Sequence, residues 1–245
     1  MLSKTKIKYI QSLGHKKFRN ETGLFIAEGP KIVKELLTDG LLQIVEIYAT
    51  TEWQAENKTS RDFQNLTIVT DEELQRISGL STCNQVLVIA KIPEPPAAII
   101  TKNKIVLMLD GIQDPGNLGT IIRIADWFGI GQLICSRECA DAFNPKVIQS
   151  SMGSIARVTL MYTNLHDWIK AHTDCSYYAT ALDGENIMDM EPLREGVIII
   201  GNESKGIGDE ILEKVNVKLT VPRRGHAESL NAAVATGIVL SHLVR

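Results

Sequence analysis

The sequence predicts an α/β protein with two domains, and three features of the chain support this fold class. After residue 104, short segments that are apolar throughout alternate with helical stretches, a pattern typical of a parallel sheet with helices on both faces. Before residue 92, shorter strands and helices alternate in a smaller unit. Between the two, three closely spaced prolines exclude a regular helix and favour an extended connector. We therefore predict domains at 1–91 and 104–245, joined by a linker at 92–103.

In the front domain, a basic amphipathic helix is expected from Lys4 to Leu13. A second helix is expected to start at Pro30, because the fixed backbone angle of proline suits the first helical turn. Asp71 is expected to cap a third helix, which runs to Ile77. Strands are expected at 24–27, 44–48, 66–69 and 85–90.

In the second domain, strands are expected at 105–109, 132–135, 156–161, 177–182, 197–200 and 217–221. The helix after the first strand carries one apolar stripe, formed by Leu118, Ile121, Ile122, Ala125 and Phe128. Arg123 projects away from this stripe and is therefore not a core residue. It is either a solvated surface arginine or a functional group.

The composition limits the functional classes. No apolar run approaches the roughly 20 residues of a membrane helix, and the start of the chain lacks the apolar core of a signal peptide. We therefore expect a cytoplasmic protein without membrane contact. The four cysteines lack the paired spacing and the nearby histidines of a zinc site. We expect structural thiols and no metal.

Charge is distributed unevenly along the chain. The formal net charge is −3, which argues against a uniformly basic nucleic-acid-binding protein. The first 20 residues nevertheless hold six basic side chains and no acidic one. They form either a patch that attracts RNA phosphates or a solvated terminus. The candidate RNA-binding residues in this stretch are Lys4, Lys6, Lys8, Lys16, Lys17 and Arg19.

The first of three segments that bear on chemistry, 109–129, comprises a strand, a glycine-rich loop and a helix. Gly116 and Gly119 allow an anion to approach the unpaired N–H groups at the start of the helix. Their spacing matches neither the dinucleotide fingerprint nor the P-loop. A nucleotide-binding oxidoreductase is therefore disfavoured.

The second segment, 197–208, leaves a buried strand for a loop with three glycines. Ligands of open α/β sheets bind at the carboxyl ends of strands, so this is a candidate binding loop. The alternative is a plain turn in which Glu203 caps the next helix.

The third segment, 219–238, runs from a strand through a basic loop into the last helix. Ser229 and Asn231 are expected at the first turn of this helix. There they either cap backbone N–H groups or face a pocket formed with the second loop. The small residues of the helix indicate close packing, against its own domain or against the same helix of a second subunit.

Together and in this order, the three segments resemble the signature motifs of one enzyme family. The motifs are DPGNLGTIIR at 114–123, IGNESKGI at 200–207 and VPRRGHAESLNAAVA at 221–235. They resemble those of the SpoU (TrmH) family of SPOUT RNA 2′-O-ribose methyltransferases, over residues 104–245. Residues 16–29 also look like the start of the family's L30e-like substrate-binding domain. The third motif departs from the common pattern at Arg223 and Arg224, since an apolar residue usually follows the proline, and at Ala232-Ala233.

The resemblance implies a C-terminal SPOUT domain with a parallel sheet and a deep trefoil knot, preceded by a small L30e-like α/β domain. It also implies a homodimer that binds S-adenosyl-L-methionine in the knot, with the active site near the subunit interface. By motif position, the cofactor would contact Gly201, Val221 and Leu230, with Ala181 and Leu182 as candidates for the adenosine pocket. The polar active-site positions would be Asn117, Arg123, Glu203, Ser229 and Asn231.

Methylation of a ribose 2′-hydroxyl requires loss of its proton and stabilisation of negative charge, because this cofactor already supplies an activated methyl group. A guanidinium, with a pKa above about 12, is a poor base. We therefore prefer charge stabilisation and phosphate positioning for Arg123 over the alternative that Arg123 itself is the general base. Glu203 or a water would then take the proton. Arg223 and Arg224 are expected to add phosphate contacts.

The front domain favours rRNA over tRNA as the substrate, since family members that act on tRNA often lack such a domain. A non-catalytic RNA-binding or ribosome-assembly protein with the same fold is a different functional class. It is disfavoured because all five polar active-site positions are retained.

Overall fold

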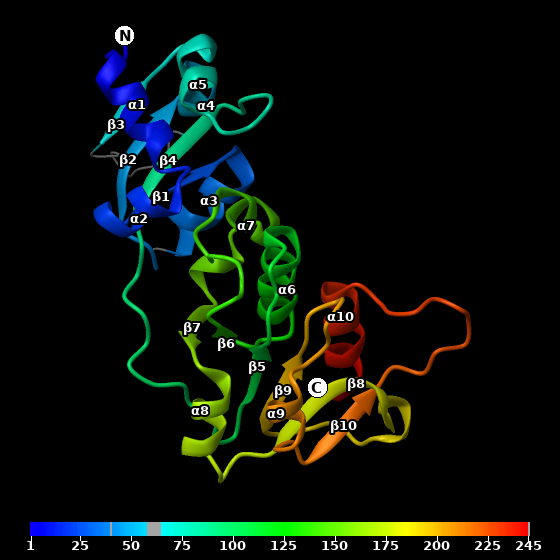
Figure 1. Cartoon of the computed structure of the whole chain (residues 1–245). Coiled ribbons are helices and arrows are strands. Elements are labelled where there is room, and N and C mark those ends of the chain that lie inside the picture. The colour runs from blue at the N-terminus through cyan, green and yellow to red at the C-terminus, as the bar shows by residue number, and fades with distance from the viewer. Residues whose placement is uncertain (40, 58–64, 245) are drawn as a thin grey trace. The chain divides into compact units, whose positions relative to one another are not determined.

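The computed structural model describes residues 1–39, 41–57 and 65–244. These residues pack into two compact units (Figure 1). The first comprises Met1–Glu94 and Phe143–Ala156, and the second comprises Pro95–Ala142 and Arg157–Arg245. The segment 143–156 therefore packs with the front unit, whereas the boundaries predicted from the sequence assign it to the C-terminal domain.

A four-stranded sheet with the order β1-β4-β2-β3 forms the centre of the first unit. β4 pairs antiparallel with β1 and β2, and β3 pairs parallel with β2. The strands are β1 (Leu24–Glu28), β2 (Ile44–Ala49), β3 (Leu66–Ile68) and β4 (Val86–Lys91). The helices are α1 (Lys4–Ser12), α2 (Lys16–Thr22), α3 (Pro30–Asp39), α4 (Thr51–Glu56), α5 (Asp71–Ile77) and α7 (Pro145–Ser151), with the 3₁₀ turn η1 (Ser154–Ala156). The four strands and the first two helices expected from the sequence are confirmed, with bounds that differ by a residue at most.

The start of α5 differs from the expectation. Its N-cap is Thr70, whose side chain accepts a hydrogen bond from the N–H of Glu73, while the Glu73 carboxylate accepts one from the N–H of Thr70. This reciprocal pair is a capping box. Asp71 is the first helical residue, so the expected cap at Asp71 was wrong by one position.

Arg19 is a structural residue of the first unit. Its side chain is 1% exposed, and its guanidinium donates hydrogen bonds to the carbonyls of Leu13 (2.9 Å) and Gly14 (2.8 Å). It ties α2 to the end of α1, because the charged group supplies donors that those carbonyls would otherwise lack. The expected contact between Arg19 and RNA phosphate was therefore wrong.

The other basic residues near the N-terminus differ in availability. Lys6 pairs with Glu46 at 2.7 Å and is only half-exposed. Lys17 lies 3.9 Å from Glu21 in an exposed i,i+4 pair. Three further lysines are exposed: Lys4, Lys8 and Lys16.

A six-stranded sheet with the order β10-β8-β9-β5-β6-β7 forms the centre of the second unit, and every neighbouring pair is parallel. The predicted parallel sheet is therefore confirmed. Its strands are β5 (Ile105–Leu109), β6 (Gln132–Ser136), β7 (Thr159–Thr163), β8 (Tyr177–Asn186), β9 (Gly196–Ile200) and β10 (Val217–Thr220). The helices are α6 (Pro115–Trp127), α8 (Leu165–Ala171), α9 (Asp209–Leu212) and α10 (Ala232–Leu243), with the 3₁₀ turn η2 (Ile187–Asp189). β7 begins three residues later than expected because residues 154–156 form η1.

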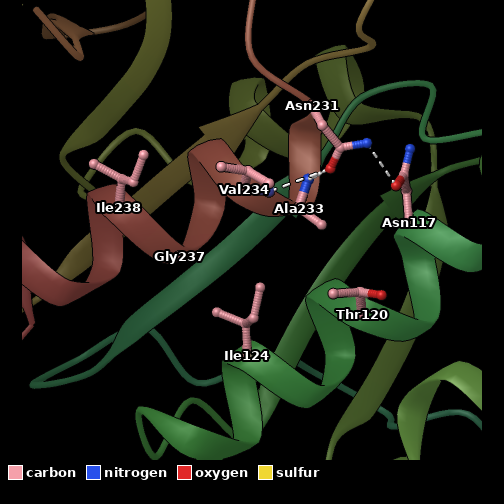
Figure 2. Close-up of a pocket in the computed structure, with 8 residues that line it drawn as sticks. All are labelled: Asn117, Thr120, Ile124, Asn231, Ala233, Val234, Gly237 and Ile238. Carbon is pink, nitrogen blue, oxygen red and sulfur yellow. Dashed lines mark hydrogen bonds between the residues drawn. The ribbon is translucent and has the colours of Figure 1, made fainter.

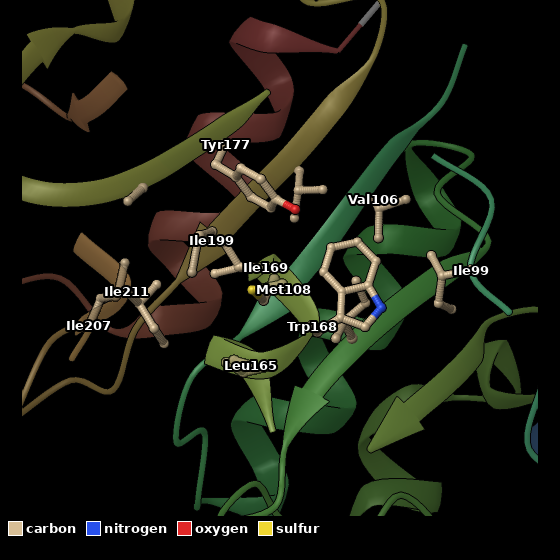
Figure 3. Packing of buried hydrophobic residues seen from close by; sticks show 13 residues of the cluster. Ile99, Val106, Met108, Leu165, Trp168, Ile169, Tyr177, Ile199, Ile207 and Ile211 are labelled. Carbon is tan, nitrogen blue, oxygen red and sulfur yellow. The ribbon is translucent and has the colours of Figure 1, made fainter. Parts of the chain in front are cut away.

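One face of this sheet packs on an apolar cluster that includes α8 (Figure 3). Val106, Met108 and Ile199 come from the sheet, and Trp168 comes from α8. Tyr177 meets Trp168 edge-on, with ring centroids 6.4 Å apart. Burial of large side chains here holds the central strands together and sets the position of their carboxyl ends.

The apolar stripe predicted on α6 is confirmed. Four of its residues are fully buried, and Phe128, which follows the last helical turn, is half-buried. Arg123 is exposed, and Trp127 is 84% exposed on the same side of the helix. α6 therefore covers the sheet with one face and presents polar and aromatic groups on the other.

Within the residues that the structure describes, we find neither a helix that could span a membrane nor a cluster that could bind a metal ion. None of the described helices combines the length and apolar character needed to span a bilayer. Within the same ranges, His, Cys, Asp and Glu side chains do not gather into a group of three that could hold a metal ion.

Because Arg19 is buried and hydrogen-bonded, we expect its replacement to destabilise the protein. Arg19→Ala should lower the free energy of unfolding by about 2–4 kcal/mol, because the buried carbonyl of Leu13 and the part-buried carbonyl of Gly14 lose a charged donor. Urea denaturation followed by circular dichroism measures this change. Lys16→Ala, at an exposed position on the same helix, is the matched control and should change the stability by less than about 0.5 kcal/mol. Equal effects of the two substitutions would contradict the structural role of Arg19.

Candidate active site

The first two sequence motifs meet because β5 and β9 are parallel neighbours. Leu109 and Ile200, their last residues, are paired in register. The loops that follow both strands therefore leave the same edge of the sheet, where ligands of open α/β sheets bind. The N–H of Asp110 still donates to the carbonyl of Ile200 at 2.9 Å. The N–H of Gly208 donates to the Asp110 carboxylate at 3.0 Å, which closes the second loop against the first.

The loop after β9 is organised by Asn202. The side-chain oxygen of Asn202 accepts hydrogen bonds from the N–H groups of Ser204 (2.9 Å) and Lys205 (3.0 Å). Its side-chain nitrogen donates to the carbonyl of Gly111 at 2.8 Å. Our sequence analysis did not single out Asn202. The available signal was an asparagine directly after a strand and before a glycine-rich loop, where such side chains commonly bind nearby backbone.

Gly201 permits a tight approach within the same loop. A Cβ atom at Gly201 would lie 2.5 Å from the carbonyl carbon of Gly206, closer than nonbonded atoms can pack. The backbone of Asn202 and Gly206 forms two hydrogen bonds across the loop, of 3.0 and 2.9 Å. A side chain at position 201 would therefore displace the loop.

Glu203 does not cap the next helix, so that alternative was wrong. The N-cap of α9 is Gly208. Glu203 instead accepts a hydrogen bond from the side-chain nitrogen of Asn117, which lies in the first turn of α6. Asp114 caps α6 by accepting from the N–H of Asn117 at 2.9 Å.

Asn231 both caps a helix and reaches the other motifs. Its side-chain oxygen accepts from the N–H groups of Ala233 (3.0 Å) and Val234 (3.3 Å) at the start of α10. Its side-chain nitrogen donates to the side-chain oxygen of Asn117 at 2.9 Å (Figure 2). Ser229 lies two residues before this cap and is exposed. The expected place of Ser229 in the first helical turn was therefore wrong, because the helix begins at Ala232.

Glu203, Asn117 and Asn231 thus form one hydrogen-bonded chain that joins the three motifs. Asn117 donates toward the carboxylate with one end of its amide and accepts from Asn231 with the other. Both bonds fix the orientation of this amide. The chain leaves the second oxygen of the Glu203 carboxylate as a further acceptor site.

A hollow of about 360 Å³ adjoins this chain between α6 and α10 (Figure 2). Asn117 and Asn231 form its polar end, and Ile124, Val234 and Ile238 line it farther along. α10 packs on α6 within its own unit, and a Cβ at Gly237 would lie 3.7 Å from Ile124. Gly237 therefore has room for a methyl group there.

The remaining candidate cofactor residues lie on the segments around β8 and β10. Val221 and Ala181 are half-buried, whereas Leu182 and Leu230 are 79% and 44% exposed. The pairing of β8 with β10 shifts between Ala179 and Glu185, so the intervening residues arch away from the ladder. The exposed apolar side chains of Leu182 and Leu230 suit a ligand with an apolar ring and polar edges, such as adenosine.

The basic residues of the third motif are on the surface. Arg223 and Arg224 are exposed, and the Arg223 guanidinium donates to the carbonyl of Ala227 at 3.3 Å. Arg123 is exposed on α6, about a third of a turn round the helix axis from Asn117. It therefore lies outside the Glu203–Asn117–Asn231 chain.

Comparison with known proteins identifies the family. Residues 104–241 match the SpoU rRNA Methylase family. The chain belongs to this family. Residues 4–88 match the MRM3-like substrate binding domain. The suspected resemblance to SpoU (TrmH) enzymes is thereby confirmed.

Several SpoU relatives align with the whole chain. The 23S rRNA (guanosine(2553)-2′-O)-methyltransferase RlmP of Bacillus subtilis (strain 168) is 33% identical over 97% of this chain and 95% of its own length. The structure of a protein assigned to the TrmH family of RNA methyltransferases from Porphyromonas gingivalis covers 100% of this chain and 99% of its own, with a TM-score of 0.88 and 33% identity. An AdoMet-bound rRNA methyltransferase from Sinorhizobium meliloti has a TM-score of 0.86 and 30% identity, over 99% of this chain and 96% of its own.

The close approach at Gly201 makes a prediction about ligand binding. Gly201→Ala should weaken binding of S-adenosyl-L-methionine about tenfold or more, equivalent to roughly 1.4 kcal/mol, because the added methyl group displaces the loop. Isothermal titration calorimetry measures this affinity.

The matched control for Gly201→Ala is Gly208→Ala. A Cβ at Gly208 would lie 3.7 Å from the Asp110 carboxylate, and its φ of −60° is accessible to alanine. This variant should keep the affinity of the unmodified protein. If the Gly201→Ala protein binds the cofactor with unchanged affinity, the assignment of Gly201 to the cofactor site is wrong.

Proposed function

We propose that this SpoU-family chain transfers a methyl group from S-adenosyl-L-methionine to a ribose 2′-hydroxyl of rRNA. The observation that carries the proposal is the hydrogen-bonded chain Glu203–Asn117–Asn231, which unites the three family motifs at the carboxyl edge of the sheet. The names of the relatives from Bacillus subtilis and Sinorhizobium meliloti support rRNA and this cofactor. We also propose a cytoplasmic location, because the relative from Bacillus subtilis acts on the rRNA of a bacterium.

The cofactor would be held largely by backbone groups around Gly201, Val221 and Leu230, with Ala181 and Leu182 beside the adenosine. Bound there, it supplies an activated methyl group. The glycine loop and the exposed apolar side chains of Leu182 and Leu230 support this assignment. The protein then has to position and orient the 2′-hydroxyl that accepts the methyl group.

Within this proposal, Glu203 takes the proton of the 2′-hydroxyl, directly or through a water. Asn117 donates to one carboxylate oxygen of Glu203 and so leaves the other to accept from the substrate. Asn231 holds the amide of Asn117 in the orientation that this requires. The Arg123 guanidinium stabilises the negative charge that develops on the ribose oxygen. Ser229 is assigned to contacts with the substrate at the exposed end of the third motif.

RNA binding is assigned to basic side chains on both units. In the first unit, the exposed residues Lys4, Lys8, Lys16 and Lys17 meet phosphates, whereas Lys6 must first leave Glu46. In the second unit, Arg223 and Arg224 are exposed beside the third motif. The match to a substrate-binding domain at 4–88 supports recognition of a folded RNA by the first unit.

The finer features of the fold are also part of the proposal. We assign residues 1–91 to an L30e-like domain, 92–103 to a linker and 104–245 to a SPOUT domain with a deep trefoil knot. The matches at 4–88 and 104–241 support these boundaries. The return of the chain from β10 to Asn231, which meets Asn117 of α6, supports the knot.

We further propose a homodimer formed through the outer faces of α6 and α10. Trp127 and Val234 are 84% and 51% exposed on these helices, beside the hollow lined by Ile124 and Ile238. Exposed apolar side chains gathered in this way are typical of interfaces. Arg123 lies on the same exposed side of α6 as Trp127, so a partner subunit would bring it to the partner's site.

The test of function is transfer of labelled methyl to RNA from a strain that lacks the gene, with the modified ribose mapped. We expect label in a large rRNA. Arg123→Ala should lower kcat/KM by roughly 10²–10³-fold, because one charge-stabilising donor is lost, and should leave cofactor affinity near that of the unmodified protein. Arg194→Ala, an exposed arginine just before β9, is the control. Label in tRNA would show that tRNA, not rRNA, is the substrate. Normal turnover by Arg123→Ala would show that Arg123 has no part in methyl transfer.

The proposed interface is tested by Trp127→Glu. A charge in an apolar interface is costly, so this variant should sediment as a monomer and lose methyl transfer. Leu41→Glu, at a position that is 60% exposed in the first unit, should remain dimeric. Analytical ultracentrifugation of the three proteins measures the difference. Dimers of Trp127→Glu at micromolar concentration would exclude this surface.

A further inference from the structure

A group of buried polar side chains lies beneath the first-motif loop and has no part in the proposed chemistry. Ser136 ends β6 and is 4% exposed, and Cys139 lies three residues later and is 6% exposed. Neither reaches a substrate, because both are covered. Their contacts are with backbone atoms between Leu109 and Ile112.

Each contact engages a backbone group at the end of β5 or in the loop that follows it. The N–H of Gly111 donates to the Ser136 hydroxyl at 3.0 Å. The N–H of Ile112 donates to the Cys139 sulfur, and the Cys139 thiol donates to the carbonyl of Leu109, both at 3.3 Å. A backbone bond from the N–H of Ala140 to the carbonyl of Ile112, at 2.8 Å, completes the set.

Gly111 is the point where the chain turns. Its φ is +66°, a conformation that favours glycine. Its N–H donates a hydrogen bond to Ser136 at the end of β6, and its carbonyl accepts one from Asn202 in the loop after β9. Both polar groups of Gly111 are therefore fixed by side chains from neighbouring segments. Asp114, the cap of α6, follows three residues later, and its partner Asn117 carries the hydrogen bond to Glu203.

An apolar residue of similar volume in place of Cys139 would fill the space but remove the acceptor for the N–H of Ile112 and the donor to the carbonyl of Leu109. The thiol of Cys135 hydrogen-bonds to Cys139 and lowers the pKa of Cys139 to about 7, although burial opposes this shift. The pKa of Cys135 itself is raised well above its ordinary value, with the same hydrogen bond as the main cause. The Cys139 sulfur is also the one that contacts the backbone of the loop.

We propose that Cys139 and Ser136 are positioning residues for methyl transfer. They hold the backbone from Leu109 to Ile112, and through it they set the place of Asn117 and therefore of the Glu203 carboxylate. This inference rests on the proposed function for its kinetic consequence. The hold on the loop is independent of that function.

The test compares Cys139→Ala, Cys139→Ser, Ser136→Ala and Cys135→Ala in the full-length protein. Cys139→Ala should lower kcat about 10- to 100-fold, because misplacement of a reacting group slows the chemical step, with less than about a threefold change in KM for the cofactor. Cys139→Ser should restore kcat to within about threefold, since a hydroxyl both donates and accepts. Cys135→Ala removes a buried thiol from the same pair but none of the loop contacts, so it should stay near the unmodified rate.

A second readout does not depend on activity. Hydrogen exchange followed by mass spectrometry should show faster exchange in the peptide 109–114 for Cys139→Ala and Ser136→Ala, and no change for Cys135→Ala. Ser136→Ala deletes one oxygen only, and so tests the proposal if Cys139→Ala fails to fold.

Unchanged exchange and unchanged kcat in both alanine variants would overturn the proposal. So would equal losses in Cys135→Ala and Cys139→Ala, or failure of serine to rescue. If the unmodified protein transfers no methyl group to rRNA, the proposed function fails, whereas the exchange of 109–114 still decides whether these residues hold the loop.

Discussion

The amide of Asn117 is the group on which the candidate site depends. It donates to Glu203, 86 residues away in sequence, and accepts from Asn231, 114 residues away. A primary amide suits this place because it offers a donor and an acceptor at fixed positions on one planar group. An aspartate would repel the Glu203 carboxylate, and an apolar residue would leave two polar partners unpaired.

The parallel sheet places these partners within reach. Because β5 and β9 are neighbours that end together, the backbone carries both loops to one edge before any side chain acts. Side chains then fix the loops: Asn202 from one side, and Ser136 with Cys139 from the other. Gly201 and Gly111 permit the close approach and the tight turn that this arrangement requires.

Burial decides which basic groups of the first unit face solvent. Arg19 and the exposed Lys16 lie on the same short helix, yet only the lysine faces solvent. Charge counts treat the two residues alike. The structure separates them because the end of α1 leaves carbonyls that need a donor, and the long guanidinium of Arg19 reaches those of Leu13 and Gly14.

Much of this protein was predictable from sequence because the deciding interactions are local. Helical periodicity, apolar runs and proline placement predicted the parallel sheet, the apolar face of α6 and the start of α3, and the three motifs identified the family. The cap of α5 is also local, because Thr70 and Glu73 have the spacing of a capping box. The partner of Glu203, the burial of Arg19 and the role of Asn202 depended on tertiary structure. These rest on contacts between distant segments, or on which of two neighbouring groups reaches an unsatisfied backbone atom. A linear pattern carries no information on that geometry.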